Sequence, residues 1–247
     1  MPNIKKLKCL NALDLKILAM VLMLCDHLWA TVVSGNRWLT DIGRMAFPIF
    51  AFQIVEGYFE TGDLKKYLKR LFIFAFISEL PFNLMYSGEL FFPFHQNVLF
   101  TFCLGLLLIR WVDKQREKGK VRFIITFFLA ALLGFLGGTV LMLDYYGFGI
   151  LMLLLFYIFR NSSRGWIGIL LGMIWINGFL MAGQDIPFTL LGHEFFFPQQ
   201  AFAIFALIPI WMYNGKLGPH NKKIQLAAYS FYPAHMLIIT VISKIFA

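Results

Sequence analysis

The sequence predicts an all-α fold, a polytopic membrane bundle of about nine transmembrane helices in one integral-membrane domain over residues 1–247. Hydrophobic residues make up 60% of the chain and charged residues 14%, whereas soluble domains have roughly half apolar and a quarter charged residues. Apolar runs long enough to cross a bilayer follow one another along the chain. The basic residues that give the net charge of +9 are clustered between these runs. This pattern favours cytoplasmic loops over a nucleic-acid-binding surface.

The predicted spans follow from the roughly 20 apolar residues that a helix needs to cross a bilayer. The sixth and the eighth are short, which leaves the count open by one or two. The segments are 13–34, 43–60, 68–86, 97–113, 122–143, 146–160, 165–183, 200–214 and 224–246.

The orientation follows from the positive-inside rule, because 18 of the 22 basic residues fall on one side of the predicted membrane. This predicts a cytoplasmic N-terminus and, with an odd number of spans, an outside C-terminus. The clustered residues are Lys5, Lys6, Lys8, Lys65, Lys66, Lys69, Arg70, Arg110, Lys114, Arg116, Lys118, Lys120, Arg122, Arg160, Arg164, Lys216, Lys222 and Lys223.

Two connections on the outer side are rich in phenylalanine and proline, residues 87–96 and 183–199. Aromatic segments of this kind suit the membrane interface. We expect them to be interfacial or re-entrant loops at the lipid headgroups.

The first span carries charges where a membrane helix is expected to be apolar. Asp14, Lys16, Asp26 and His27 all lie in it. Ionisable groups at bilayer depth cost several kcal/mol unless they face a polar interior, so we expect them to be functional. Lys16 and His27 are three helical turns apart, about 16 Å along one face. We expect this face to line a reaction chamber.

Other spans add polar groups that would be costly in isolation and are expected to surround one wet cavity. Glu79 and Asn83 are four residues apart, as are Asn97 and Thr101, so each pair faces one direction. The expected members are Asp26, His27, Arg44, Glu79, Asn83, Asn97, Thr101, Asp144, Tyr145 and Tyr146 in the outer half, Asp14, Lys16, Glu56 and Arg70 in the inner half, and His235 in the last span.

Structural roles remain open for several of these side chains. Glu56 would then pair with Arg70 or a nearby lysine, and Asn97 with Thr101 would hold helices together. Arg44 would extend toward the outer surface. His95, His193 and His220 lie in predicted loops, where solvation is expected.

The sequence lacks the usual signatures of metal and nucleotide chemistry. Cys9, Cys25 and Cys103 have neither metal-ligand nor disulfide spacing, and no P-loop or Rossmann fingerprint occurs. No metal is therefore expected, and the chemistry falls to carboxylates and imidazoles.

Several motifs together resemble the TraX family. The first span contains LDLKILAMVLMLCDH, and Gly43 begins the run GRMAFPIFAFQIVEG. Four further motifs follow in the order in which the family has them: RLFIFAFISELPFN, NVLFTFCLGLLL, DYYGFG and YPAH. The resemblance implies a multi-pass protein of the bacterial inner membrane and the family's named activity, N-terminal acetylation of conjugative pilin. The first span is also loosely similar to that of acyltransferase-3 membrane proteins, with Asp14, Lys16 and His27 in the matching places.

The resemblance implies an acetyltransferase that uses cytoplasmic acetyl-CoA and an outer peptide amine or cell-surface glycan as acceptor. His27 would be the general base, and Asp26 or Glu79 would orient it. Arg44, Asn97 or a tyrosine would stabilise the oxyanion. The expected donor contacts are Lys16, Lys69, Arg70, Asn97, Tyr146 and His235. The alternative hypothesis is a secondary transporter that uses the same ionisable side chains as a proton relay. A third hypothesis is a structural or assembly protein without catalytic turnover.

Overall fold

Helices account for most of the chain in the computed structural model, which describes residues 8–181, 183–219 and 221–246, so Lys5, Lys6 and His220 lie outside the described residues. The elements in this part are α1 (Ala12–Thr31), α2 (Trp38–Gly43), α3 (Ala46–Glu60), α4 (Leu64–Tyr86), α5 (Val98–Arg116), α6 (Lys120–Val140), α7 (Tyr146–Phe159), α8 (Gly165–Ile174), the π-helix η2 (Trp175–Leu180), β1 (Asp185–Leu190), β2 (His193–Pro198), the 3-10 helix η3 (Gln199–Ala206), α9 (Leu207–Trp211) and α10 (Lys222–Phe246).

The nine predicted segments all form helix, so the helical class is confirmed. The seventh is α8 continued by η2, and the eighth is η3 continued by α9. The short helix α2 is an addition, because it precedes the apolar run that we predicted to begin at residue 43. Two helices in the described part of the chain, α6 and α10, are long and apolar enough to cross a membrane by themselves.

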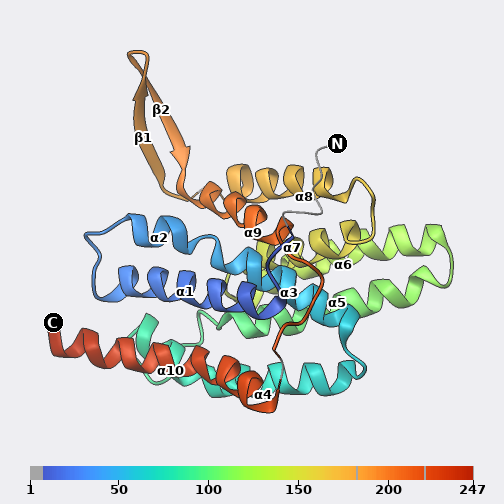
Figure 1. The fold of residues 1–247 in the computed structure, drawn as a ribbon, viewed down its shortest axis with the longest axis horizontal. Coiled ribbons are helices and arrows are strands. Elements are labelled where there is room, and N and C mark those ends of the chain that lie inside the picture. The colour runs from blue at the N-terminus through green and yellow to red at the C-terminus, as the bar shows by residue number, and fades with distance from the viewer. Residues whose placement is uncertain (1–7, 182, 220, 247) are drawn as a thin grey trace.

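Most of the long helices run in similar directions, and the basic connections meet at one end (Figure 1). The α3–α4, α5–α6 and α7–α8 connections lie together on the right of the view. Residues 8–12 join this end through backbone hydrogen bonds, since Leu10 pairs with Met212 and Asn214, and Ala12 donates to Lys216 at 2.8 Å. We call this the basic end, and the opposite end, which carries the β1–β2 hairpin, the hairpin end.

Helix α7 lies in the interior, between α3, α5, α6 and α8. Eight of its residues are buried, and its side chains belong to the main core. Gly149 lets neighbouring helices approach, since a Cβ there would lie 2.9 Å from the Thr101 methyl group and 3.0 Å from the Phe47 ring. An enclosed position explains why this segment is short and almost free of charge.

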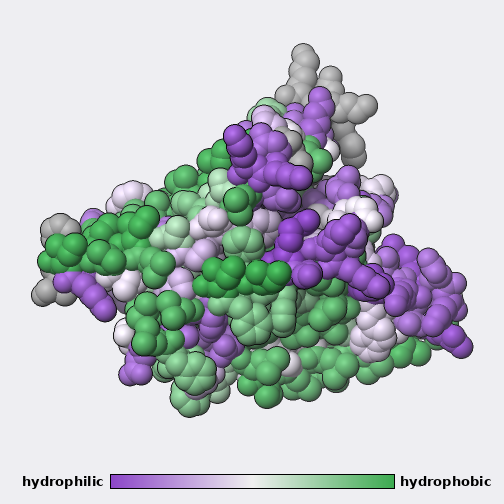
Figure 2. Space-filling model, turned by 90° about the horizontal axis from the view of Figure 1, so that it is seen from below, coloured by the Kyte–Doolittle hydropathy of each residue, from purple (hydrophilic) through white to green (hydrophobic). Residues whose placement is uncertain are grey.

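The outward faces of the peripheral helices are apolar. Figure 2 shows hydrophobic side chains, in green, over much of the face seen from below, with hydrophilic residues gathered toward the basic end. Continuous apolar surface on this scale is rare in soluble monomers. Exposed members include Phe72, Phe76 and Leu80 on α4, Phe128, Leu132 and Leu136 on α6, and Leu237, Ile238 and Val241 on α10.

The connection over residues 183–199, which we expected to be an interfacial or re-entrant loop, contains a β-hairpin that we did not predict. β1 and β2 pair antiparallel, with Asp185 opposite Pro198 and Leu190 opposite His193. The turn is formed by Leu191 and Gly192, whose φ angles of +52° and +80° suit a two-residue hairpin turn. The β-favouring residues on both sides of this turn explain the strands, which project from the bundle (Figure 1).

Polar residues at helix starts have local partners. Asn11 caps α1, and Asp14 completes the capping box by accepting from the Asn11 backbone N–H at 2.9 Å. Asp14, which we expected to be functional, therefore has a structural contact. Asp63 caps α4 by accepting a hydrogen bond from the Lys66 backbone N–H. This hydrogen bond holds the pKa of the Asp63 carboxyl below its usual value.

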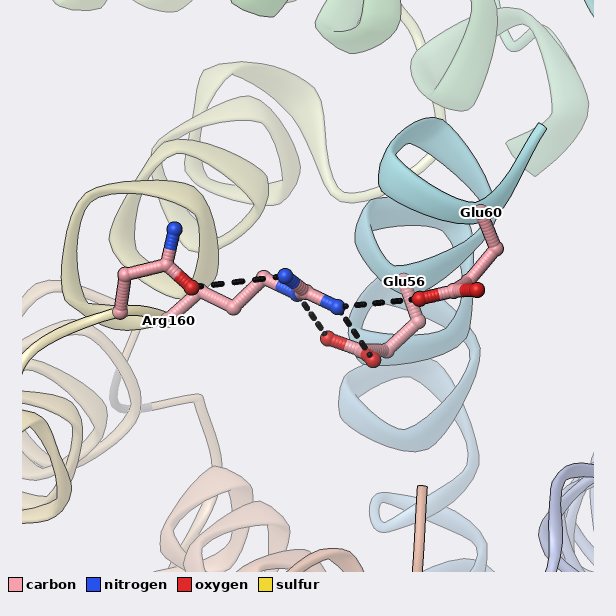
Figure 3. A network of polar contacts seen from close by, with 4 residues as sticks. Glu56, Glu60 and Arg160 are labelled. Carbon is pink, nitrogen blue, oxygen red and sulfur yellow. Dashed lines mark hydrogen bonds and ion pairs between the residues drawn. The ribbon is translucent and has the colours of Figure 1, made fainter. Parts of the chain in front are cut away.

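Glu56 forms an ion pair at the basic end, and its partner is Arg160 instead of the predicted Arg70 or a lysine (Figure 3). The Arg160 guanidinium binds both carboxylate oxygens, at 2.6 and 3.1 Å, and also lies 3.4 Å from Glu60. Its central carbon sits 4.3 Å from the Phe59 ring centroid. A forked, stacked contact of this kind suits arginine and would be lost with lysine.

The close approach of α1 and α2 predicts that Gly43→Ala destabilises the protein. A Cβ at Gly43 would lie 2.5 Å from the Asp26 Cβ, so the helices must separate. We expect a loss of about 1–3 kcal/mol, as for overpacked cores, although alanine favours helix over glycine. Thermal unfolding followed by circular dichroism in detergent measures the loss. Gly35→Ala is the control, because nothing lies within 4 Å of that position; equal shifts for the two variants would refute the steric explanation.

Candidate functional site

The side chains of His27 and His235 meet between the first and the last helix. The Nδ1 atom of His27 lies 2.8 Å from the Nε2 atom of His235, and the ring planes are within 11° of parallel. His235 Nδ1 lies 2.8 Å from the Phe231 carbonyl oxygen, one turn earlier on α10. We expected His235 to contact the acyl donor; it contacts His27.

Asp26, the neighbour of His27 in sequence, has different partners. The Thr40 hydroxyl donates to Asp26 at 2.6 Å and accepts from the Arg44 guanidinium at 2.7 Å. Arg44 also lies 3.5 Å from the Asp26 carboxylate. Arg44 is thus turned toward α1 instead of toward the surface. The pairing of Asp26 with His27 that we considered is replaced by this Asp26–Thr40–Arg44 cluster.

A cavity of about 330 Å³ extends into the bundle from the basic end; we call it the large cavity. Thr61, Leu217 and Pro219 border it where the helix connections lie. Lys16 and Arg70 both line it, as predicted for the inner half of the bundle. Its volume is within the range of small-molecule sites, roughly 300–1,000 Å³.

Two polar atoms of the large cavity, Gln53 Oε1 and Arg70 Nε, are shielded from solvent and have no hydrogen-bond partner among the residues that the structure describes. The Gln53 amide is oriented by the hydrogen bond from its Nε2 to the Ala12 carbonyl at 2.6 Å, which leaves its oxygen available to a ligand. Unsatisfied buried groups are costly, and a bound ligand is one way to satisfy them. The cavity therefore presents an unpartnered acceptor at Gln53 and an unpartnered charged donor at Arg70, in addition to the Lys16 ammonium group.

The walls of the large cavity lead toward the histidine pair. On α1, Lys16, Met20 and Met23 line it, and their spacing of four and three residues continues to His27. On α10, Gln225, Ala228 and Tyr232 line it, and the same face continues to His235. The two histidines thus lie one turn beyond the lining residues on both helices.

The remaining predicted site residues lie outside this cavity lining. Lys69 is exposed, beside Arg70 in sequence. Asn97 caps α5 and donates its side-chain amide to Glu79 and to the Ala75 carbonyl, which gives Glu79 a partner other than His27. Tyr146 is half exposed.

His95 is mostly buried, contrary to its predicted solvation. Its Nε2 atom lies 3.4 Å from the Asp144 carboxylate, and its side chain is 15% exposed. The ring meets the edge of Tyr86 at a centroid distance of 4.4 Å and lies parallel to Tyr146 at 6.3 Å. The 87–96 segment is therefore held against the bundle by its last residues.

A smaller cavity of about 260 Å³ lies at the hairpin end, lined by Trp29, Arg44, Gly183, Gln184, Gln199 and Gln200. The Trp29 indole nitrogen is shielded from solvent and has no hydrogen-bond partner in the described part of the chain. Gln199 donates to Asp41 at 2.8 Å and Gln200 donates to Asn177 at 3.1 Å. Sequence reasoning missed Thr40 and these glutamines; polar residues directly beside an apolar segment were the available signal.

The described residues contain no group of three or more histidine, cysteine, aspartate or glutamate side chains that could hold a metal ion. The histidine pair has two nitrogen atoms in contact with each other, so it is arranged as a hydrogen-bonded pair. The arrangement suits acid–base chemistry by an imidazole.

These features define a helical protein with an apolar exterior, a cavity that extends from the basic end toward the middle of the bundle, and a partly buried pair of histidines one helical turn beyond its lining. The chain belongs to the TraX protein family, whose sequence pattern matches residues 12–243. The resemblance noted from the sequence motifs is thereby confirmed.

Two curated relatives show partial similarity. One is a probable fimbrial assembly protein, FimC of serogroup H1, from Dichelobacter nodosus, with 34% identity over 40% of this chain and 45% of the relative. The other is protein TraX from Escherichia coli, with 29% identity over 61% of this chain and 57% of the relative. The chain spans about half the length of these relatives. No solved structure matches the chain.

The Asp26–Thr40–Arg44 cluster predicts that Thr40→Val destabilises the protein by about 1–3 kcal/mol, because Asp26 and Arg44 lose a shared buried partner. Valine keeps the shape of threonine, so packing is unchanged. Thr139→Val is the control, since its exposed hydroxyl only bonds back to Phe135. Thermal unfolding in detergent compares them, and a near-neutral Thr40→Val would show that the hydroxyl adds little.

Proposed function

We propose that this protein is a transmembrane acetyltransferase that moves an acetyl group from cytoplasmic acetyl-CoA to an amine or hydroxyl acceptor on the outer side. The observation that supports this most is the large cavity, which opens at the basic end and whose α1 and α10 walls lead to His27 and His235. A partly buried imidazole one helical turn beyond the lining of a ligand-sized cavity is suited to general base catalysis.

The proposal includes a multi-pass arrangement with about nine spans in the bacterial inner membrane. The apolar outward faces of α4, α6 and α10 support it, since they would otherwise be in water. The meeting of the basic connections at one end supports a cytoplasmic position for that end. The hairpin end then faces outward.

Acetyl-CoA enters the large cavity with its acetyl group first, and its phosphates remain at the basic end. Lys16 and Arg70 provide positive charge there, and Gln53 Oε1 is free to accept a pantetheine amide N–H. Glu56 and Glu60 also line this cavity and would repel phosphate, but both are engaged by Arg160 (Figure 3). Arg160 therefore supports donor binding by offsetting part of the negative charge of the two carboxylates.

The reaction at the inner end of the cavity needs one base. The acceptor nitrogen or oxygen attacks the thioester carbonyl carbon, and His27 takes the proton that the acceptor loses. The tetrahedral intermediate then expels the CoA thiolate, and that thiolate takes the proton back from His27. Arg44 is the candidate to stabilise the oxyanion from the hairpin end. The products are the acetylated acceptor and CoA thiol, with the enzyme unchanged.

The acceptor approaches from the hairpin end, where the smaller cavity lies beside Arg44. The relatives support a pilin-related role, because one is named for fimbrial assembly. The family resemblance likewise implies pilin acetylation. A peptide with a free N-terminal amine is accordingly the first acceptor to test. A cell-surface glycan is the second.

His27→Ala is predicted to reduce acetyl transfer by at least about 10²-fold, the usual contribution of a general base, while acetyl-CoA binding stays unchanged. The assay uses purified protein in liposomes with acetyl-CoA on one side and a peptide with a free N-terminus on the other. His193→Ala is the control, because that side chain is exposed on the hairpin. Full turnover by His27→Ala would remove His27 from the mechanism; proton-coupled flux without acetyl-CoA binding would favour a transporter.

Donor binding at the large cavity predicts a difference between two adjacent basic residues. Arg70→Ala should weaken acetyl-CoA binding by about 10- to 10²-fold, since it removes a charge-assisted contact worth about 1.5–3 kcal/mol. Lys69→Ala should change binding by less than about twofold, because exposed charges contribute little. Isothermal titration calorimetry with acetyl-CoA measures both. Equal losses would indicate general electrostatic attraction instead of a site at Arg70.

A further inference from the structure

The contacts of His235 fix which of its nitrogen atoms carries hydrogen. Its Nδ1 lies 2.8 Å from the Phe231 carbonyl oxygen, and a carbonyl oxygen can only accept. Nδ1 therefore carries the hydrogen. In the neutral ring, the lone pair is then on Nε2, the atom that faces His27.

The same reasoning determines which nitrogen of the His27 ring carries hydrogen. Since His235 Nε2 can only accept, His27 Nδ1 must donate across the 2.8 Å contact. A neutral His27 ring then has its lone pair on Nε2, away from His235. One carbonyl on α10 thus determines the tautomer of a ring on α1.

We propose that His235 is the positioning residue of the acetyl transfer: it holds His27 as the Nδ1–H tautomer, so that Nε2 is the proton-accepting atom. This inference rests on the proposed function for its catalytic consequence, but the tautomer itself is a property of the resting protein. His235 does not touch the acetyl donor in this scheme. It acts through His27.

The two carboxylates that we considered for orienting His27 do not compete for this role. Asp26 is bound to Thr40 and Arg44, and Glu79 is bound to Asn97. In the described part of the chain, His235 is the polar partner of the His27 side chain. His235 is itself held in place, since the Phe231 ring lies parallel to it at a centroid distance of 4.8 Å.

The orienting group is neutral, unlike the aspartate that orients histidine in serine-protease triads. A neutral acceptor fixes ring orientation and tautomer without placing a second charge in an apolar bundle, where an unpaired ion is costly. When His27 takes the acceptor's proton at Nε2, its Nδ1–H stays on His235. The proton returns to the CoA thiolate from the same Nε2 atom, so His235 ends each cycle as it began.

The test compares His235→Gln with His235→Phe. Glutamine has an oxygen that can accept from His27 Nδ1 and an NH₂ group that can donate to the Phe231 carbonyl. Phenylalanine has an aromatic ring of similar shape but can form neither hydrogen bond. We expect the Phe variant to lose kcat by about 10²-fold and the Gln variant to stay within about tenfold of wild type, with KM for acetyl-CoA unchanged in both. A Phe variant with wild-type kcat, or a Gln variant as impaired as Phe, would overturn the assignment.

A second measurement separates this inference from the proposed function, because it needs no substrate. Solid-state ¹⁵N NMR of histidine-labelled protein above pH 8 reports which ring nitrogen is protonated, and a His27→Phe sample identifies the His27 signals. We expect His27 to carry hydrogen on Nδ1 in wild type and in His235→Gln, and a mixture of tautomers in His235→Phe. Hydrogen on Nε2 of His27 in wild type would refute the proposal even if acetyl transfer is confirmed. The expected signals without any transfer would leave the tautomer assigned and the proposed function rejected.

Discussion

A polar group inside an apolar bundle needs a partner, and in this protein the partners come from distant parts of the chain. His27 on α1 meets His235 on α10, which ties the first helix to the last. The same requirement joins α3 to the end of α7 and α4 to the start of α5. The pairs are His27–His235, Glu56–Arg160 and Glu79–Asn97, together with the Asp26–Thr40–Arg44 cluster.

The partners also divide the bundle into two chemically different ends. At the basic end, Arg160 engages the acidic side chains that border the large cavity, which leaves Lys16 and Arg70 to set its charge. At the hairpin end, Arg44 is held by neutral and acidic oxygens beside a smaller cavity. If the protein transfers a group across a membrane, the donor would bind at the basic end and the acceptor at the hairpin end, with the histidine pair between them.

Several features of the fold and site were predictable from the sequence because they depend on local periodicity. The nine apolar segments form helix, and the 3.6-residue repeat correctly placed Lys16 and His27 on one face, with Lys16 in the cavity. The short, charge-poor sixth segment proved to be an interior helix, α7. The hairpin was missed because its aromatic residues were interpreted as a membrane-interface signal, although they equally favour strands.

The sequence by itself determined which segments are helical, where the basic residues lie and which side chains would be costly in an apolar interior. Only the tertiary structure decided how these side chains pair. Asp26 is adjacent to His27 in sequence, but on a helix consecutive residues point about 100° apart, so it meets Thr40 and Arg44 instead. His235, which is 208 residues away, reaches His27 because the packing of α10 against α1 brings the two rings together.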